Sequence, residues 1–280
     1  MKPFPIPVVG ELPFTLEEEG PSLIVESPGD MAVFRMPARY TPTEPAHEQA
    51  ACEVIERLLG ALGAWKFGEA DYPCLELDGL DAGSLRVLHE TLGEGEVGAR
   101  LGPRAEAQET AFAGIWWLRT LGPAGEVSSE RLEACAIPED VRRAARGKAG
   151  IDIPPATAGL MNAPALIAEI AERSARYRVD GTSHVINLTL LPVTPEDLEY
   201  LDATLGRGGV SLLSRGYGNC RITATAVDGV WWVQYFNASD KLILNTLEIT
   251  GLPEAALAAP EDLADSVERL AECLAALREG

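Results

Sequence analysis

The chain of 280 residues carries a formal net charge of −20, and 46% of its residues are hydrophobic. A surface this acidic repels nucleic-acid phosphates and anionic lipids, so neither is expected as a partner. No run of about 18 apolar residues occurs, which argues against a membrane-spanning helix and membrane insertion. The negative charge either serves solubility alone or attracts a cationic segment of a partner protein.

The N-terminus and the cysteines both indicate a cytoplasmic protein. Residues 1–7 contain too many prolines, and too short an apolar stretch, for a secretory leader. The five cysteines stand singly along the chain, without the spacing of a disulfide framework. We therefore expect a cytoplasmic location.

Residues 1–45 are expected to form an irregular arm with one strand at Met31–Met36. In residues 46–140, apolar positions that recur every three or four residues predict helices, and Asp81 is the expected N-cap of the second one. Runs with high β-propensity predict strands. The expected elements are the helix Glu48–Leu62, the strand Tyr72–Leu77, the helix Asp81–Leu92, and strands near Val97–Leu101, Thr110–Arg119 and Val127–Cys135.

Residues 141–164 are predicted to be a linker, whose basic run 142–148 is expected to form a solvated helical turn. Residues 165–280 then repeat the earlier order of elements, with Thr194 as an N-cap and Pro195 at the first helical position. The expected elements are the helix Ala165–Arg176, the strand His184–Leu191, a helix from Pro195, the strands Val210–Ser214, Cys220–Val227, Val230–Phe236 and Leu242–Ile249, and the helix Asp262–Leu277.

The four strands between residues 208 and 249 give the strongest strand signal in the chain and predict an antiparallel meander. Asp228-Gly229 separates two apolar runs. This dipeptide is typical of a type I′ hairpin turn, because that turn needs a positive φ at both central positions.

A segment with weaker similarity to this region lies earlier in the chain. Residues 113–119 match residues 228–234 at an offset of 115, and residues 81–93 match residues 194–206 at an offset of 113. These matches predict a tandem duplication, with a first repeat at 46–140 that has diverged and a second repeat at 165–280. The expected fold class is α+β: a duplicated α-β-α-β-β-β unit, with antiparallel sheets that carry helices on one face and cover each other's remaining face.

Few residues have the pattern of an active site, and we expect no enzyme activity, no metal and no cofactor. The three histidines are far apart in sequence, and neither C-x-x-C nor H-x-x-x-H occurs. Cys220 and His184 could still form a nucleophile–base pair in the fold. A thiol-dependent enzyme or an iron-delivery protein is therefore the alternative hypothesis.

The predicted partner-binding site lies at the tip of the meander and along its third strand. In the second repeat the tip holds two arginines, a tyrosine and an asparagine around two glycines, whereas the first repeat has Leu101-Gly102-Pro103-Arg104-Ala105-Glu106 in its place. Arginine and tyrosine are enriched at protein–protein interfaces. The candidate residues are Arg215, Tyr217, Asn219, Arg221, Trp232, Gln234, Tyr235, Phe236 and Asn237.

Two structural alternatives compete with this prediction. Arg215 and Arg221 could form ion pairs inside the protein. Trp231 and Trp232 must face opposite sides of their strand. Because the first repeat keeps Trp116 and Trp117, packing is the simpler role for these tryptophans.

The run GGVSLLSRGYGNCRITATAVDGVWWVQYFNASDKLILNTLE and the residues after it, over about 194–259, resemble the C-terminal conserved region of the HupH/HyaF/HoxQ family of hydrogenase expression/formation proteins. The resemblance implies a non-enzymatic accessory factor in [NiFe]-hydrogenase maturation. It further implies binding of the immature iron–sulfur small subunit before assembly and export, with other hydrogenase accessory proteins as further candidate partners. A scaffold that merely dimerises is a third possibility.

Overall fold

The computed structural model describes residues 44–156, 158–216 and 218–279, and the strand expected at Met31–Met36 lies outside them. No helix of the described residues is long and apolar enough to cross a membrane. The first half contains α1 (Pro45–Ala64), β1 (Cys74–Glu76), α2 (Ala82–Leu92), β2 (Val97–Leu101), β3 (Ala105–Glu109), β4 (Ile115–Leu121), β5 (Val127–Ala134) and α3 (Glu139–Ala144). The second half contains α4 (Ala163–Asp180), β6 (His184–Asn187), η1 (Leu188–Leu190), α5 (Pro195–Leu205), β7 (Val210–Ser214), β8 (Asn219–Ala224), β9 (Val230–Phe236), β10 (Leu242–Ile249), η2 (Glu254–Ala256) and α6 (Pro260–Glu279).

Local capping signals set where two helices begin. The side chain of Asp81 accepts hydrogen bonds from the backbone N–H groups of Gly83 and Ser84, at 2.8 and 3.0 Å, and so caps α2. Thr194 and Asp197 form a capping box at the start of α5. An oxygen acceptor here satisfies N–H groups that have no partner within the helix. Both predicted N-caps are therefore confirmed.

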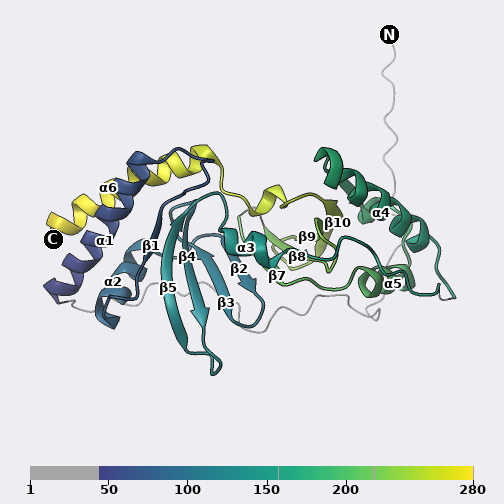
Figure 1. The fold of residues 1–280 in the computed structure, drawn as a ribbon, viewed down its shortest axis with the longest axis horizontal. Helices are drawn as coiled ribbons and strands as arrows, with labels where there is room; N and C mark the ends of the chain where they lie inside the picture. Colours follow the sequence, from purple (N-terminus) through teal and green to yellow (C-terminus); the bar gives the residue numbers. More distant parts are fainter. Residues whose placement is uncertain (1–43, 157, 217, 280) are drawn as a thin grey trace, which may run out of the picture.

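The ten strands of the described residues form one antiparallel sheet, in the order β1-β5-β4-β3-β2-β7-β8-β9-β10-β6 (Figure 1). The halves meet where β2 pairs with β7, and Ala99 lies opposite Leu212 at the centre of this pairing. The expectation of separate sheets that cover each other's faces is wrong. The halves join edge to edge instead, through backbone hydrogen bonds that remove one open edge from each.

Helices cover the two ends of one side of this sheet, which we call the helix side. At one end α1, α2 and α6 pack on a core that includes Leu88, Trp117 and Leu270. At the other end α4 and α5 pack on a core that includes Leu201 and Trp232. Between the two groups, the described helices that lie over the central strands are the short α3 and η2, and both pack against the core on the opposite side of the sheet (Figure 1).

The opposite side of the sheet carries a third core, to which both halves contribute. It includes Trp116 and Leu118 from the first half and Leu212, Trp231 and Val233 from the second. The short elements α3 and η2 contact it at β2 and β7. Adjacent tryptophans therefore face opposite sides of the sheet in both halves, as the alternation of a strand predicts.

The C-terminal helix packs on the first half of the sheet. We placed it with the second repeat, yet Leu263, Leu270 and Leu274 of α6 belong to the core of the first half. Arg278 also forms an ion pair with Glu56 of α1, at 2.7 Å. The predicted limits at residues 141 and 165 fall inside α3 and α4.

Several strands are shorter than predicted, and the two largest differences arise where local turns interrupt the predicted strand. The strand expected at 110–119 begins only at Ile115, after a turn in which the Ile115 N–H donates to Phe112 O at 3.0 Å. The preceding strand, β3, was missed because its sequence AEAQE has low β-propensity. The strand expected at 184–191 ends at Asn187, whose side chain accepts a hydrogen bond from the Thr189 N–H at 3.0 Å and begins η1.

The turn at Asp228-Gly229 also differs from the prediction. Gly229 has a φ of 71°, whereas Asp228 does not adopt a positive φ, so the expected type I′ turn is wrong. The Thr225 N–H donates to Val230 O at 3.0 Å, and the Val230 N–H donates to Val227 O at 3.1 Å. The hairpin loop is therefore wider than two residues, which removes the need for two left-handed positions.

Candidate functional site

The candidate site is the uncovered strip on the helix side of the central strands β3, β2, β7 and β8, which we call the trough. Pairing across these strands places two rows of side chains on its floor. One row consists of Gln108, Gly98, Leu213 and Arg221, and the other of Glu106, Arg100, Ser211 and Thr223. Six of these eight residues are polar or charged, in contrast to the apolar cores at either end of the sheet.

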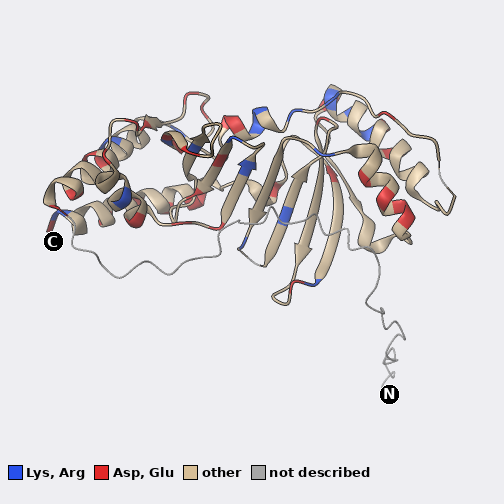
Figure 2. Cartoon of the chain, turned by 90° about the horizontal axis from the view of Figure 1, so that it is seen from below, with Lys and Arg blue, Asp and Glu red and all other residues tan. Residues whose placement is uncertain are grey.

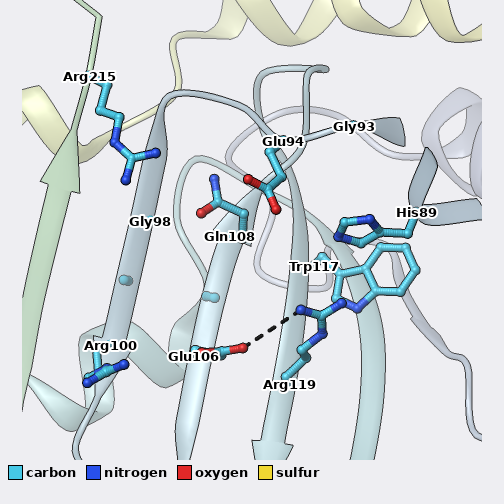
Figure 3. Close-up of a pocket in the computed structure, with 12 residues that line it drawn as sticks. His89, Gly93, Glu94, Gly98, Arg100, Glu106, Gln108, Trp117, Arg119 and Arg215 are labelled. Carbon is cyan, nitrogen blue, oxygen red and sulfur yellow. Dashed lines mark ion pairs between the residues drawn. The ribbon is translucent and has the colours of Figure 1, made fainter. Parts of the chain in front are cut away.

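A pocket of about 260 Å³ opens at the end of the trough nearest α2 (Figure 3). The end of α2 and the residues after it form the rim of the pocket, residues of β2, β3 and β4 form its floor and wall, and Arg215, after β7, lines its remaining side. Its labelled lining consists of His89, Gly93, Glu94, Gly98, Arg100, Glu106, Gln108, Trp117, Arg119 and Arg215. Residues from both halves of the chain therefore build this pocket.

A ladder of alternating charges crosses the pocket. The pairing of β5, β4, β3 and β2 places Glu130, Arg119, Glu106 and Arg100 side by side in that order. Arg119 lies 2.7 Å from Glu130 and 3.8 Å from Glu106, so two carboxylates share one guanidinium. The same guanidinium lies 5.7 Å from the ring centre of Trp117, which holds it against the pocket wall.

His89 lies beside this aromatic wall. Its ring meets the Trp117 ring edge to face, with the centroids 5.2 Å apart. Burial, and then the positive charge of Arg119, lowers the pKa of His89. The neutral imidazole is therefore favoured near pH 7, and it leaves the guanidiniums as the cations of the pocket.

Gln108 is fixed on the floor by backbone groups. Its side-chain amide donates to the carbonyl oxygens of Gly95 and Val97, at 3.2 and 3.1 Å. These bonds hold the loop before β2 against β3, so the rim of the pocket is tied to its floor. The pocket is thus a fixed feature of the sheet rather than a gap between loose segments.

The corresponding position in the second half is nearly filled. The space between the end of α5 and strands β8 and β9 measures only about 20 Å³, and its lining includes Asp202, Thr223 and Trp232. The Trp232 indole N–H donates to Asn245 Oδ1 at 2.6 Å, which fixes the ring there. The open pocket therefore lies on the half that sequence analysis treated as the diverged one.

The residues predicted at the tip of the meander have different roles in the structure. Arg215 lines the pocket in the trough. Tyr217 lies outside the described residues. Asn219 donates from its side chain to Asp240 at 3.0 Å, and Asn237 accepts the N–H groups of the turn that follows it. Both asparagines thus build the tip itself.

The residues predicted along the third strand are mostly enclosed. Trp232, Gln234 and Phe236 are buried on the helix side, with 8%, 5% and 8% of their surfaces exposed. Tyr235 faces the opposite side and packs against the third core. The guanidinium of Arg221 lies 4.6 Å from the ring centre of Phe236, so this arginine borders the trough with its face against an aromatic ring.

The structure does not bring Cys220 and His184 together. Two strands, β9 and β10, separate β8 from β6 in the sheet. Cys220 belongs to the third core on the opposite side, and burial raises the pKa of its thiol to about 11. His184 lies 2.7 Å from Glu169 at the sheet edge. The nucleophile–base pair of the alternative hypothesis is therefore absent from this arrangement.

Among the described residues, no group of three or more His, Cys, Asp or Glu side chains is arranged to hold a metal ion.

The trough itself was not predicted from the sequence. Its signal was the alternation of polar residues in β2 and β3, where Arg100, Glu106 and Gln108 all face the helix side. We did not recognise this alternation because β3 was not predicted.

Comparison with known proteins gave consistent matches. The family model for the HupH hydrogenase expression protein, C-terminal conserved region, matches residues 49–148 and again 160–277. The chain is 43% identical to hydrogenase expression/formation protein HoxQ of Azotobacter vinelandii, over 93% of each chain. It is 47% identical to HupH of Rhodobacter capsulatus over 78% of each chain, and 34% identical to the hydrogenase-1 operon protein HyaF of Escherichia coli over 81% of each. A solved structure of HupH from Thiobacillus denitrificans covers 41% of this chain and 95% of its own, at 35% identity and a TM-score of 0.39.

Proposed function

The chain belongs to the HupH family of hydrogenase expression/formation proteins, and from this membership we propose that it is a non-enzymatic accessory protein in hydrogenase maturation. In this proposal it binds the immature iron–sulfur small subunit of a [NiFe]-hydrogenase in the cytoplasm, before assembly and export. The family resemblance supplies the partner. The structure supplies a surface suited to binding a protein segment.

The observation that carries this proposal is the trough. It is a strip of sheet without a covering helix among the described residues, its floor is polar, and guanidinium groups with an aromatic wall line its pocket. Arg215, which sequence analysis placed at the binding tip, lies in this pocket. Partly exposed arginine and aromatic groups in a concavity are typical of the residues that carry binding energy at protein interfaces.

We also propose that a tandem duplication produced the two halves. The family model matches each half separately. Each half also contains an equivalent backbone hydrogen bond. Thr110 N–H donates to Ile115 O at 2.8 Å in the first half, and Thr225 N–H donates to Val230 O at 3.0 Å in the second, at positions 115 residues apart. In this proposal the first half kept an open pocket while the second half filled the matching space.

The net charge of −20 suggests how the partner is first attracted. Small-subunit precursors of this enzyme class carry a twin-arginine export signal. We propose that the acidic exterior attracts this cationic segment, while the tip and Arg215 make short-range contacts. Attraction between exposed charges weakens as salt shortens the Debye length, which is about 10 Å at 0.1 M.

Pull-down of the purified small-subunit precursor tests this function. We expect binding to the wild-type protein, with an affinity that falls between 50 and 500 mM salt. Arg215→Ala combined with Tyr217→Ala should weaken binding about tenfold, because loss of such an interface residue costs on the order of 1–2 kcal/mol. Arg178→Ala, which removes an exposed arginine in the last turn of α4, is the matched control and should change the affinity less than twofold.

Two outcomes would refute the assignment. Absence of precursor binding at both salt concentrations would remove the proposed partner. Undiminished binding by the Arg215→Ala, Tyr217→Ala variant would keep the partner but place its binding site elsewhere on the protein.

A further inference from the structure

Guanidinium groups gather in the trough of a protein whose net charge is −20. Arg100, Arg119 and Arg215 line the pocket, and Arg221 lies on β8 in the floor of the trough. Figure 2 shows Lys and Arg segments on strands in the middle of the sheet, while many Asp and Glu segments lie on the helices at its ends. The trough is thus a local departure from the acidic exterior.

The carboxylates near the trough are placed so that they leave Arg100 available. Glu106 and Glu130 both face Arg119, at 3.8 and 2.7 Å. Glu94 and Glu96 lie in the exposed loop after α2, at the end of the pocket that Arg215 lines rather than at the end of Arg100. Arg100 stands at the end of the charge ladder and forms no ion pair with any residue that the structure describes.

On its other side Arg100 neighbours a neutral residue. Ser211 is its partner across the seam between β2 and β7, so no acidic side chain follows it in the row. Arg100 is partly exposed and lines a pocket of about 260 Å³. A planar guanidinium in this setting can hold a carboxylate through two parallel hydrogen bonds.

Arg215 approaches the same space from the other end of β2 (Figure 3). Its backbone N–H donates to Glu96 O at 3.0 Å, which places residue 215 level with residue 96 on the neighbouring strand. Four residues of extended chain separate that level from Arg100, a span of about 13 Å. An extended peptide in the trough could therefore present carboxylates to Arg100 and Arg215 from residues two to four positions apart.

We propose that the trough binds an extended acidic segment of the partner protein, with its carboxylates on Arg100 and Arg215. This inference rests on the proposed function and adds the chemistry of the segment that the trough recognises. It differs from attraction of the cationic export signal, which involves the acidic exterior. The two contacts act on opposite charges of the partner, and they use separate parts of this protein.

Fluorescence polarisation with a defined probe tests the proposal. The probe is a ten-residue peptide of alternating serine and glutamate that carries fluorescein, and its counterparts contain glutamine or lysine in place of glutamate. At 150 mM salt the Debye length is about 8 Å, so short-range contacts with the trough persist while the remote acidic surface is largely screened. We expect the glutamate peptide to bind at least tenfold more tightly than either counterpart.

Variants distinguish peptide binding in the trough from peptide binding elsewhere on the surface. Arg100→Ala and Arg215→Ala should each weaken binding of the glutamate peptide about tenfold, and Arg100→Lys should retain part of the affinity. Arg178→Ala removes the same charge outside the trough and should change the affinity less than twofold. Far-UV circular dichroism and the urea midpoint of each variant check that it folds, which is expected because Arg100 is partly exposed and forms no ion pair with the described residues.

Three outcomes would overturn the proposal. The lysine peptide could bind more tightly than the glutamate peptide, or the Arg100→Ala and Arg215→Ala variants could bind the glutamate peptide as well as wild type does. Tighter probe binding after Glu17→Gln, Glu18→Gln and Glu19→Gln together would identify this chain's own acidic run as the occupant. Precursor pull-down with the same variants keeps the two proposals apart, because retained precursor binding alongside any of these results leaves the proposed function standing.

Discussion

At the scale of single residues, one buried carboxyl group is poised to change its charge near neutral pH. Glu109, at the end of β3, is 6% exposed and accepts a hydrogen bond from the Gly114 N–H at 2.9 Å. Burial raises the pKa of Glu109 to about 7; the Gly114 N–H opposes this, whereas the charges of Glu96 and Asp262 add to it. The folded protein therefore keeps a proton on this group at pH values where the unfolded chain has lost it.

Replacing Glu109 tests this balance. Because its folded pKa lies above the unfolded value of about 4.3, the wild-type free energy of unfolding should fall as pH rises from about 4.3 to 7. Glu109→Gln keeps an oxygen acceptor for the Gly114 N–H but cannot ionise. Its stability relative to wild type should therefore rise by on the order of 2 kcal/mol between pH 5 and pH 8, as measured by urea denaturation.

The exposed residue Glu199 on α5 supplies the control for that experiment. Glu199→Gln removes an exposed carboxyl group instead of a buried one, so the stability of this variant relative to wild type should be nearly constant between pH 5 and pH 8. An equally constant difference for Glu109→Gln would show that the Glu109 carboxyl is not protonated in the folded protein.

Residue patterns predicted only part of the candidate site. Arg215 was found from sequence because it stands beside glycines in a hairpin tip that differs between the two predicted repeats. Arg100 and Arg119 were not found, since each is a single charged residue within a strand and becomes part of a ladder only through pairing across strands. Which side chains meet in this way depends on strand register, and register is a property of the whole sheet.

At the scale of elements, Asp197 joins α4 to α5. Its carboxylate accepts hydrogen bonds from the backbone N–H groups of Met161, Asn162 and Ala163, at 2.9 to 3.2 Å, and from Thr194 at 3.1 Å. Burial works to raise the pKa of Asp197, but these N–H groups outweigh it and hold the pKa below its ordinary value. One side chain thus accepts hydrogen bonds at the N-terminal ends of both helices.

Asp197→Ala should lower the free energy of unfolding by about 3 kcal/mol, because it leaves several buried N–H groups without an acceptor. The folded pKa is depressed, so the stabilisation from Asp197 is present above the unfolded pKa of about 3.9 and is lost as pH falls through the folded value. Urea denaturation at pH 7 measures the loss. Glu199→Ala, an exposed position on the same helix, should cost less than 0.5 kcal/mol, and an equal loss in both variants would contradict this role for Asp197.

Elements that depend on local chemistry were predictable, and those that depend on distant pairing were not. The caps at Asp81 and Thr194 follow from residues within one turn of helix. Strand β3, with the sequence AEAQE, is a strand because β2 and β4 pair on both sides of it. Tertiary pairing overrides its weak propensity, and this pairing cannot be read from a short window of sequence.

At the scale of the whole molecule, the α+β class was predictable from the alternation of helical and strand patterns. The continuous sheet was not, because the β2–β7 seam joins residues more than 100 positions apart in the chain, such as Ala99 and Leu212. The third core also crosses this seam and contains buried residues of both halves. The halves therefore share backbone hydrogen bonds and apolar packing, which predicts that they unfold together.

Leu212→Ala at the seam tests that cooperation. Leu212 is 2% exposed, and its truncation should lower the free energy of unfolding by about 3 kcal/mol through lost burial and a residual cavity. If the sheet is one cooperative unit, the variant should unfold in a single urea transition, and hydrogen exchange of β4 and β9 should accelerate by the same factor although the strands lie in different halves. Val127→Ala, at a residue 51% exposed, should leave both strands unchanged. Faster exchange confined to β9, or two separate transitions, would show instead that each half is stable independently and that the seam is only a contact between two domains.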